Sequence, residues 1–304
     1  MYDLIIIGGG PAGLTAGIYA MRSQLKTLLL EKMIPGGQVL TTYEVENYPG
    51  FAEKILGQTL MDNMEKQARN LGLEIKLEDV TDVELEPSEK IITTSEATYK
   101  AKSVIIATGA SPRSLQINGE KEFTGRGVSY CATCDGFFFK NKEIAIVGGG
   151  NTALEEALYL SNIVSKVTLI HRRDEFRAVK ILQERVFNNK KIDILFNSIV
   201  VEITGDKKAN TLKIKNVKTE KIKDFIVDGL FISIGLLPNT SLFENKLLFE
   251  DGFIKSDEEM RTSIAGVFAA GDVRSKSVRQ IVTAAADGAI AALTAEKYLE
   301  SLRD

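Results

Sequence analysis

The chain has no tryptophan, a single histidine and only two cysteines among its 304 residues. A structural zinc site takes four ligands, mostly cysteine and histidine, and this chain supplies only Cys131, Cys134 and His171 of these two types. We therefore expect no metal site. The length predicts about two domains, because single cores usually stop growing below this size.

Long hydrophobic runs and a strong charge of one sign are also missing. No segment approaches the roughly 18 consecutive apolar residues of a membrane span, and an apolar strand begins at Leu4 without a preceding basic region or cleavage site. The formal net charge is −3, which gives no reason to expect nucleic acid or an acidic membrane surface as partner. We expect a cytoplasmic protein with no membrane association.

Both cysteines lie in one short stretch, "SYCATCDGFFF". Thiols are kept reduced in the cytosol, so a close pair there points to catalysis or metal binding more than to a structural disulfide. With zinc disfavoured, two interpretations remain for Cys131 and Cys134: a redox-active dithiol, or two inert thiols that are neighbours in the chain. Asp135 follows directly and is a candidate acid or base.

Two segments repeat one pattern of apolar strand, glycine turn and helix. They read "LIIIGGGPAGLTAGIYA" from residue 4 and "IAIVGGGNTALEEALYL" from residue 144. Their small residues are Gly8, Gly10 and Gly13 in the first turn and Gly148, Gly150 and Ala153 in the second. Such turns let backbone N–H groups approach a pyrophosphate at a helix N-terminus. One match is weak, but two in this context predict two dinucleotide sites.

The residues after the second strand of each repeat indicate which dinucleotide that repeat binds. Glu31 ends the first such strand, where an acid accepts hydrogen bonds from an adenosine ribose. His171 ends the second, and Arg172, Arg173 and Arg177 follow. Three cations suit a 2′-phosphate and favour NADPH over NADH. The alternative is a solvated basic face of a helix starting near Asp174.

Each repeat is followed by short alternating strands, at 81–109 and 199–235, and each closing strand is followed by a proline, Pro112 or Pro238. These prolines mark crossings between domains. We expect an α/β fold of two Rossmann-like dinucleotide-binding domains of the three-layer ββα type. The first comprises 1–112 and 242–304, with a helix at 280–299 that packs on it, and the second, 113–241, is inserted.

A further apolar strand ends in "VFAAGDV" and delivers Gly271 and Asp272 to a loop. An aspartate exposed there can hydrogen-bond the ribityl chain of a flavin. Taken alone, however, the pair is typical of an ordinary turn.

The motifs together resemble those of low-molecular-weight thioredoxin reductases, in the same order and over nearly the whole chain. They are "GGGPAG", "GGQ", "ENYPG", "ATGA", "CATCDGFF", "GGGNTA", "HRRDEFRA", "GLLPNT" and "GVFAAGDV". The resemblance implies an FAD enzyme, usually a homodimer, that passes electrons from NADPH through flavin and a dithiol to thioredoxin.

The resemblance also assigns roles to residues. It implies FAD contacts by Gly8, Gly10, Gly13, Glu31, Gln38, Asn47, Asp272 and Gln280, and we place Gly271, which directly precedes Asp272, in the same predicted cofactor site. It implies NADPH contacts by Gly148, Gly150, Arg172, Arg173 and Arg177. By the same resemblance Cys134 faces the flavin, Cys131 attacks the thioredoxin disulfide, and Asp135 serves as acid and base.

The order of motifs has a mechanical consequence. The cysteines directly precede the NADPH repeat, so dithiol and nicotinamide share one domain while the flavin belongs to the other. Both must reach one ring system, and we expect the inserted domain to rotate about the crossings near Pro112 and Pro238.

Three other functions are alternatives to thioredoxin reduction. A flavin dithiol oxidase or a ferredoxin-fed reductase has no need of the arginines at 172 and 173. A nucleotide-binding redox sensor, whose thiols switch a partner without turnover, would be separated from an enzyme by catalysis under excess NADPH.

Overall fold

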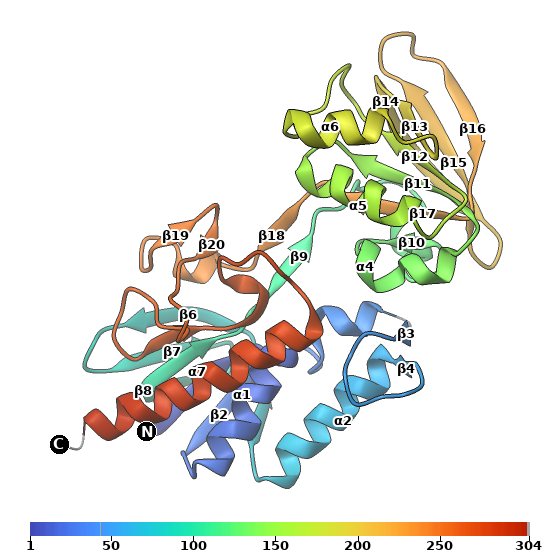
Figure 1. Ribbon diagram of the computed structural model, residues 1–304. Coiled ribbons are helices and arrows are strands. Elements are labelled where there is room, and N and C mark those ends of the chain that lie inside the picture. Colours follow the sequence, from blue (N-terminus) through green and yellow to red (C-terminus); the bar gives the residue numbers. More distant parts are fainter. Residues whose placement is uncertain (43, 303–304) are drawn as a thin grey trace. The chain divides into compact units, whose positions relative to one another are not determined.

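A computed structural model describes residues 1–42 and 44–302, and the chain folds into two compact units (Figure 1). Unit 1 comprises Met1–Ser111 and Leu237–Asp304, and unit 2 comprises Pro112–Leu236. The chain passes between the units through β9 (Ala110–Pro112) and β18 (Leu236–Pro238), which pair as a two-stranded sheet.

Unit 1 is built on a seven-stranded sheet in the order β5-β2-β1-β8-β7-β6, with β21 also paired to β8. Its strands are β1 (Tyr2–Ile7), β2 (Thr27–Glu31), β5 (Glu74–Leu77), β6 (Val80–Leu85), β7 (Lys90–Thr94), β8 (Thr98–Ile106) and β21 (Val267–Ala269). The pairs among β5, β2, β1, β8 and β21 are parallel, while β6 and β7 pair antiparallel. The apolar run in β1 fits a strand covered on both faces.

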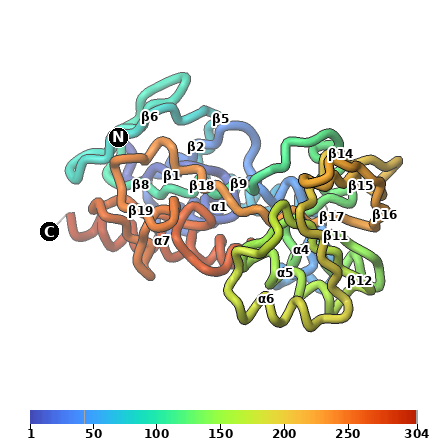
Figure 2. Tube along the Cα trace, turned by 90° about the horizontal axis from the view of Figure 1, so that it is seen from above, coloured from blue at the N-terminus to red at the C-terminus, as the bar shows by residue number. Residues whose placement is uncertain are grey.

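Alternate residues of β1 enter two different cores of unit 1. Leu4 and Ile6 pack under the helices α1 (Pro11–Arg22), α2 (Gly57–Asn70) and α7 (Ile281–Ser301). Ile5 and Ile7 face the opposite layer, formed by β6, β7 and the segment around Phe243. The helix α7 lies along α1 (Figure 2), and a Cβ at Gly288 would sit 2.1 Å from the Ala12 carbonyl oxygen. Glycine is therefore required for this close approach.

Unit 2 repeats this plan with a five-stranded parallel sheet in the order β10-β17-β11-β12-β13. Its strands are β10 (Val128–Ser129), β11 (Glu143–Gly148), β12 (Lys166–Ile170), β13 (Ile192–Leu195) and β17 (Gly229–Ser233). The helices α5 (Asn151–Ser161) and α6 (Lys180–Phe187) cover one face. An antiparallel sheet of β14 (Ser198–Gly205), β15 (Ala209–Asn216) and β16 (Ile222–Ile226) covers the other.

This arrangement confirms the predicted α/β class with two Rossmann-like units and the ββα layering. The two meanders differ in one respect: β6 and β7 continue the main sheet of unit 1 through β8, whereas β14, β15 and β16 form a sheet of their own.

The remaining described elements are short. They are the helices η1 (Gly37–Thr41), α3 (Glu120–Phe123), α4 (Ala132–Asp135), η2 (Gly136–Phe139), η3 (Ser241–Phe243) and η4 (Gly271–Val273), and the strands β3 (Glu44–Val45), β4 (Ile55–Leu56), β19 (Phe249–Glu250) and β20 (Phe253–Ile254). Within the described ranges, no helix has both the length and the apolar character to cross a bilayer.

The helix start near Asp174, which the alternative interpretation of the arginines assumed, is wrong, because α6 begins only at Lys180. The preceding backbone is held by the second glycine turn instead. The N–H of Arg177 donates to the Gly149 carbonyl at 2.8 Å, and the N–H of Val179 donates to Asn151 Oδ1 at 2.9 Å. These bonds replace the i−4 carbonyl partners that a helix would provide.

Candidate active site

The first glycine turn joins β1 to α1, and two of its glycines are required by sterics. Gly8 has a φ of +107°, and a Cβ there would lie 2.4 Å from the Ala107 carbonyl oxygen. A Cβ at Gly13 would lie 1.8 Å from the Gly8 carbonyl oxygen. At Gly10, the N-cap of α1, a Cβ would meet no atom within 4 Å. Open space above a helix N-terminus fits a dinucleotide pyrophosphate.

Glu31 lies beside this turn. One carboxylate oxygen accepts the N–H of Gly9 at 2.7 Å, and the other accepts the N–H of Met33 at 3.1 Å. The acid at the end of β2 is thus held against the glycine turn, the position that a ribose hydroxyl bond requires.

Asp272 carries a buried acceptor that the protein does not satisfy. Among the described residues, Asp272 Oδ1 has no hydrogen-bond partner, although Lys276 Nζ lies 3.5 Å away as an ion pair. Burial raises the pKa of Asp272, and the charges of Lys276 and Arg279 oppose that shift. A buried polar atom without a partner is costly, so a ligand hydroxyl at this point would be stabilised. The residues present therefore fit a flavin.

A buried ion-pair network supports this loop from α7. Asp287 accepts the N–H of Gly271, whose φ is +79°, at 3.0 Å, and the ammonium of Lys276 at 3.0 Å. Arg274 pairs with the other oxygen of Asp287 at 3.4 Å. Lys276 thus bridges two carboxylates, Asp287 and Asp272.

The predicted flavin residues from distant segments also come together in unit 1. Asn47 Nδ2 donates to Gln280 Oε1 at 3.2 Å across a sequence separation of 233 residues. Gln280 is the N-cap of α7 and forms a reciprocal capping box with Thr283. Gln38 is exposed in η1, and a Cβ on its neighbour Gly37 would be 3.3 Å from Gly10 Cα.

The second glycine turn, between β11 and α5, has the same steric plan. A Cβ at Gly148 would lie 2.4 Å from the Ser233 carbonyl oxygen, while one at Gly150 would again meet nothing within 4 Å. The ring of His171 lies against Gly149, as Glu31 lies against Gly9 in the first turn. The cradle therefore fits a second dinucleotide, but without the acid.

Arg172, Arg173 and Arg177 are exposed, and in the part of the chain that the structure describes none of these three forms an ion pair. Burial lowers the pKa of His171, and the charges of Arg177 and Arg173 act in the same direction. These effects disfavour the charged form of His171, so the positive charge beside the turn comes from the arginines. Unpaired guanidinium groups fit a phosphate on the ribose.

The dithiol belongs to the same unit as the second turn. Cys131 and Cys134 form a disulfide with an S–S distance of 2.05 Å at the helix α4. The helix packs against α5, since a Cβ at Gly136 would lie 2.5 Å from Leu160 Cδ2. The interpretation of two separate thiols is therefore wrong, and the linked pair fits the redox-active interpretation.

Asp135 is held beside the disulfide by Ser129, the first residue of the cysteine stretch, to which the sequence analysis assigned no role. Ser129 Oγ donates to Asp135 Oδ2 at 2.5 Å and accepts the N–H of Cys131 at 3.1 Å. Burial raises the pKa of Asp135, and the bond from Ser129 opposes the shift. A carboxyl group with a raised pKa is suited to protonating a thiolate.

Lys276 and Asp287 were likewise not predicted, although the spacing of Asp272 and Lys276 by four residues was an available signal. The network through Asp287 had none, because it depends on how α7 packs.

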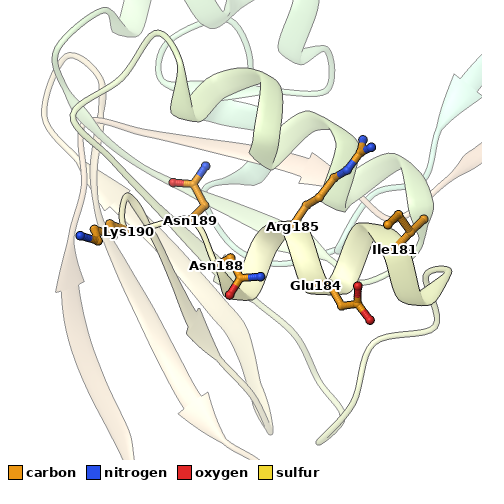
Figure 3. Close-up of a pocket in the computed structure, with 6 residues that line it drawn as sticks. All are labelled: Ile181, Glu184, Arg185, Asn188, Asn189 and Lys190. Carbon is orange, nitrogen blue, oxygen red and sulfur yellow. The ribbon is translucent and has the colours of Figure 1, made fainter.

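A surface pocket of about 610 Å³ lies beside α6 (Figure 3). Its lining is Ile181, Glu184, Arg185, Asn188, Asn189 and Lys190. None of the predicted site residues lines it.

Comparison with known proteins gives a consistent result. The family model described as pyridine nucleotide-disulphide oxidoreductase matches residues 2–288. A thioredoxin reductase of Listeria monocytogenes is 50% identical over 306 residues, covering 100% of this chain and 96% of the relative. One from Peptoclostridium acidaminophilum is 48% identical over 308 residues, covering 99% and 98%. The crystal structure of thioredoxin reductase from Streptococcus pyogenes superposes with a TM-score of 0.95 at 46% identity, covering 99% of each chain.

Proposed function

The chain belongs to the pyridine nucleotide-disulphide oxidoreductase family, and from that premise we propose that it is a flavoprotein that reduces oxidised thioredoxin with electrons from NADPH. The observation that carries the proposal is the Cys131–Cys134 disulfide beside a partly buried carboxyl group, in the same unit as a glycine turn flanked by exposed arginines.

The cofactor assignment follows the two turns. FAD would be held in unit 1 by Gly8, Gly10, Gly13, Glu31, Gln38, Asn47, Gly271, Asp272 and Gln280. NADPH would be held in unit 2 by Gly148, Gly150, Arg172, Arg173 and Arg177. When bound, the flavin takes a hydride from NADPH and supplies two electrons to a disulfide.

The protein's own residues carry the second half-reaction. Reduction opens the Cys131–Cys134 bond and gives a dithiol. The thiolate of Cys131 attacks one sulfur of the thioredoxin disulfide, forming a mixed disulfide and releasing a thiolate that Asp135 protonates. Cys134 then attacks the sulfur of Cys131, which reforms the bridge and releases thioredoxin as a dithiol. The close spacing lets Cys134 resolve the mixed disulfide without leaving α4.

The partner would contact the surface beside the dithiol. Phe137, three residues after Cys134, exposes 58% of its surface, and the ammonium of Lys140 lies 5.7 Å from its ring centroid. An exposed aromatic residue next to a reactive pair is suited to docking a small protein.

Three further features complete the proposal. The inserted unit rotates about the crossings β9 and β18, because dithiol and nicotinamide residues share unit 2 while flavin residues lie in unit 1. The enzyme acts as a homodimer, and exposed apolar residues of α7 such as Val282, Ile290 and Leu293 are available for a second copy. It works in the cytoplasm, where thiols are kept reduced.

The test is anaerobic NADPH consumption by the FAD-loaded protein, with and without oxidised thioredoxin and with NADH alongside. We expect sustained consumption that needs thioredoxin, prefers NADPH and disappears in Cys134→Ser. Flavin reduction without thioredoxin-dependent turnover would refute the acceptor and favour a redox sensor. A flavin that NADPH never bleaches would refute the donor.

A further inference from the structure

Ser129 is hydrogen-bonded both to the backbone of Cys131 and to the carboxyl group of Asp135. It ends β10, is only 5% exposed, and pairs with Phe231 of β17. Its hydroxyl oxygen lies 2.5 Å from Asp135 Oδ2, 3.1 Å from the backbone nitrogen of Cys131 and 3.3 Å from the Cys131 carbonyl oxygen. These contacts join the start of the dithiol segment to the carboxyl group that follows it.

The geometry decides where the single hydroxyl proton goes. A hydroxyl donates once and accepts at its lone pairs. The contact with Asp135 is the shorter of the two possible donations and has the length of a bond to a carboxylate. The N–H of Cys131 then donates to the same oxygen. Asp135 and the backbone of Cys131 are therefore fixed relative to one another through one atom.

We propose that Ser129 is a positioning residue for thiol–disulfide exchange, whose hydroxyl holds the carboxyl group of Asp135 in register with Cys131. The inference rests on the proposed function and adds a residue to it. Because the same hydrogen bond stabilises the ionised carboxylate, Ser129 also sets the upper pH limit at which Asp135 still carries a proton.

Among the groups around Asp135, Ser129 is the one whose hydrogen bond opposes the effect of burial on the pKa of Asp135. The other titratable groups around α4 are Tyr130 and Glu120 before it, Glu155 and Glu156 on α5, and Lys140 and Lys142 near η2. Among the described residues, the pKa of Asp135 is raised by burial and lowered only by the bond from Ser129. Tyr130 donates to Glu120 at 2.8 Å, and Glu156 accepts the N–H of Ala132.

Removing the hydroxyl of Ser129 should move the pH dependence of turnover to higher pH. Asp135 acts as an acid in its protonated form, so turnover falls as pH rises through its pKa. Without the hydroxyl of Ser129, burial acts unopposed, the pKa of Asp135 rises further, and the falling limb of the pH profile moves to higher pH. Without the hydroxyl, the carboxyl group of Asp135 is also no longer held in register with Cys131, which lowers kcat by about tenfold.

The experiment compares FAD-loaded Ser129→Ala, Asp135→Asn and the double variant with the wild type, as kcat for thioredoxin reduction against pH. Ser198→Ala is the matched control, because Ser198 is a buried serine of the same unit that donates to the Phe196 carbonyl at 2.9 Å, away from the dithiol. We expect Ser129→Ala to lower kcat and shift the falling limb upward, and Ser198→Ala to do neither. Ser129→Thr, which keeps a hydroxyl, should restore the limb.

The double variant distinguishes a loss of Asp135 positioning from a general loss of structure. If Ser129 acts through Asp135, removing its hydroxyl from Asp135→Asn should cost much less than it costs the wild type. A lower kcat with an unmoved limb, or equal losses in both backgrounds, would overturn the inference while leaving the proposed function standing. A wild type without thioredoxin-dependent turnover would instead overturn the proposed function. If Ser129→Ala does not fold, Ser129→Thr decides: a wild-type profile supports the inference, and a profile like that of Asp135→Asn refutes it.

Discussion

Changing Gly10 to alanine should leave the stability of the fold nearly unchanged and weaken the binding of FAD. Gly10 has φ −73° and ψ −174°, which any residue adopts, and an added methyl group would meet no protein atom within 4 Å. The substitution therefore fills only the space above the N-terminus of α1, where we propose that the FAD pyrophosphate lies.

The cost to folding is small. Alanine is a poorer N-cap than glycine by about 1 kcal/mol at most, while lower chain entropy in the unfolded state returns about 0.4–1 kcal/mol. We expect the unfolding free energy of the cofactor-free protein to change by less than about 1 kcal/mol.

The cost to binding is larger. A methyl group that displaces the pyrophosphate removes at least one hydrogen bond to a charged oxygen, worth about 1.5–3 kcal/mol. That loss raises the dissociation constant for FAD roughly 10- to 100-fold.

Two further glycines serve as controls. Gly150→Ala has the same open surroundings in the second turn, so it should weaken NADPH binding and spare FAD. Gly13→Ala would place a methyl carbon 1.8 Å from the Gly8 carbonyl oxygen and should prevent stable folding.

The assays are thermal unfolding of each cofactor-free variant and titration with FAD and NADPH followed by flavin fluorescence. Wild-type affinity for FAD in Gly10→Ala would refute the assignment of the first turn. Equal weakening of both ligands by both variants would refute the division of the ligands between the two turns.

Two other predictions concern charge. The double substitution Arg172→Ala and Arg173→Ala removes charge-assisted contacts, so it should raise KM for NADPH about 10-fold or more and leave KM for NADH unchanged. Steady-state kinetics with both nucleotides measures these two constants. An unchanged KM for NADPH would contradict the prediction. In Lys276→Met the pKa of Asp272 should rise further because a cation that lowers it is gone. As pH is lowered, FAD affinity, measured by equilibrium dialysis, should therefore begin to fall at a higher pH than in the wild type, and coinciding curves would contradict the role of Lys276.

Much of the site was readable because its determinants are local. A glycine turn between strand and helix is imposed by backbone sterics over a few residues, so Gly8, Gly13 and Gly148 can be recognised without tertiary information. The contrast between Glu31 and His171 is likewise a matter of position after a strand. The same holds for the short spacing of Cys131 and Cys134.

The start of α6 could not be read in this way. The residues 171–179 have no proline or glycine to end a helix, yet the N–H groups of Arg177 and Val179 bond to Gly149 and Asn151 of another segment. Tertiary hydrogen bonds here override the local preference.

The two Rossmann-like units, the close cysteine pair and the order of the motifs could be predicted from the sequence, because each depends on periodicity and on residues close in the chain. The contact of Asn47 with Gln280 and the bridge from Lys276 to Asp272 and Asp287 could be found only in the folded protein. These contacts join α7 to loops of unit 1 that are distant in sequence. Buried polar groups need partners, but which partner each one finds is set by the packing of the helices on the sheet.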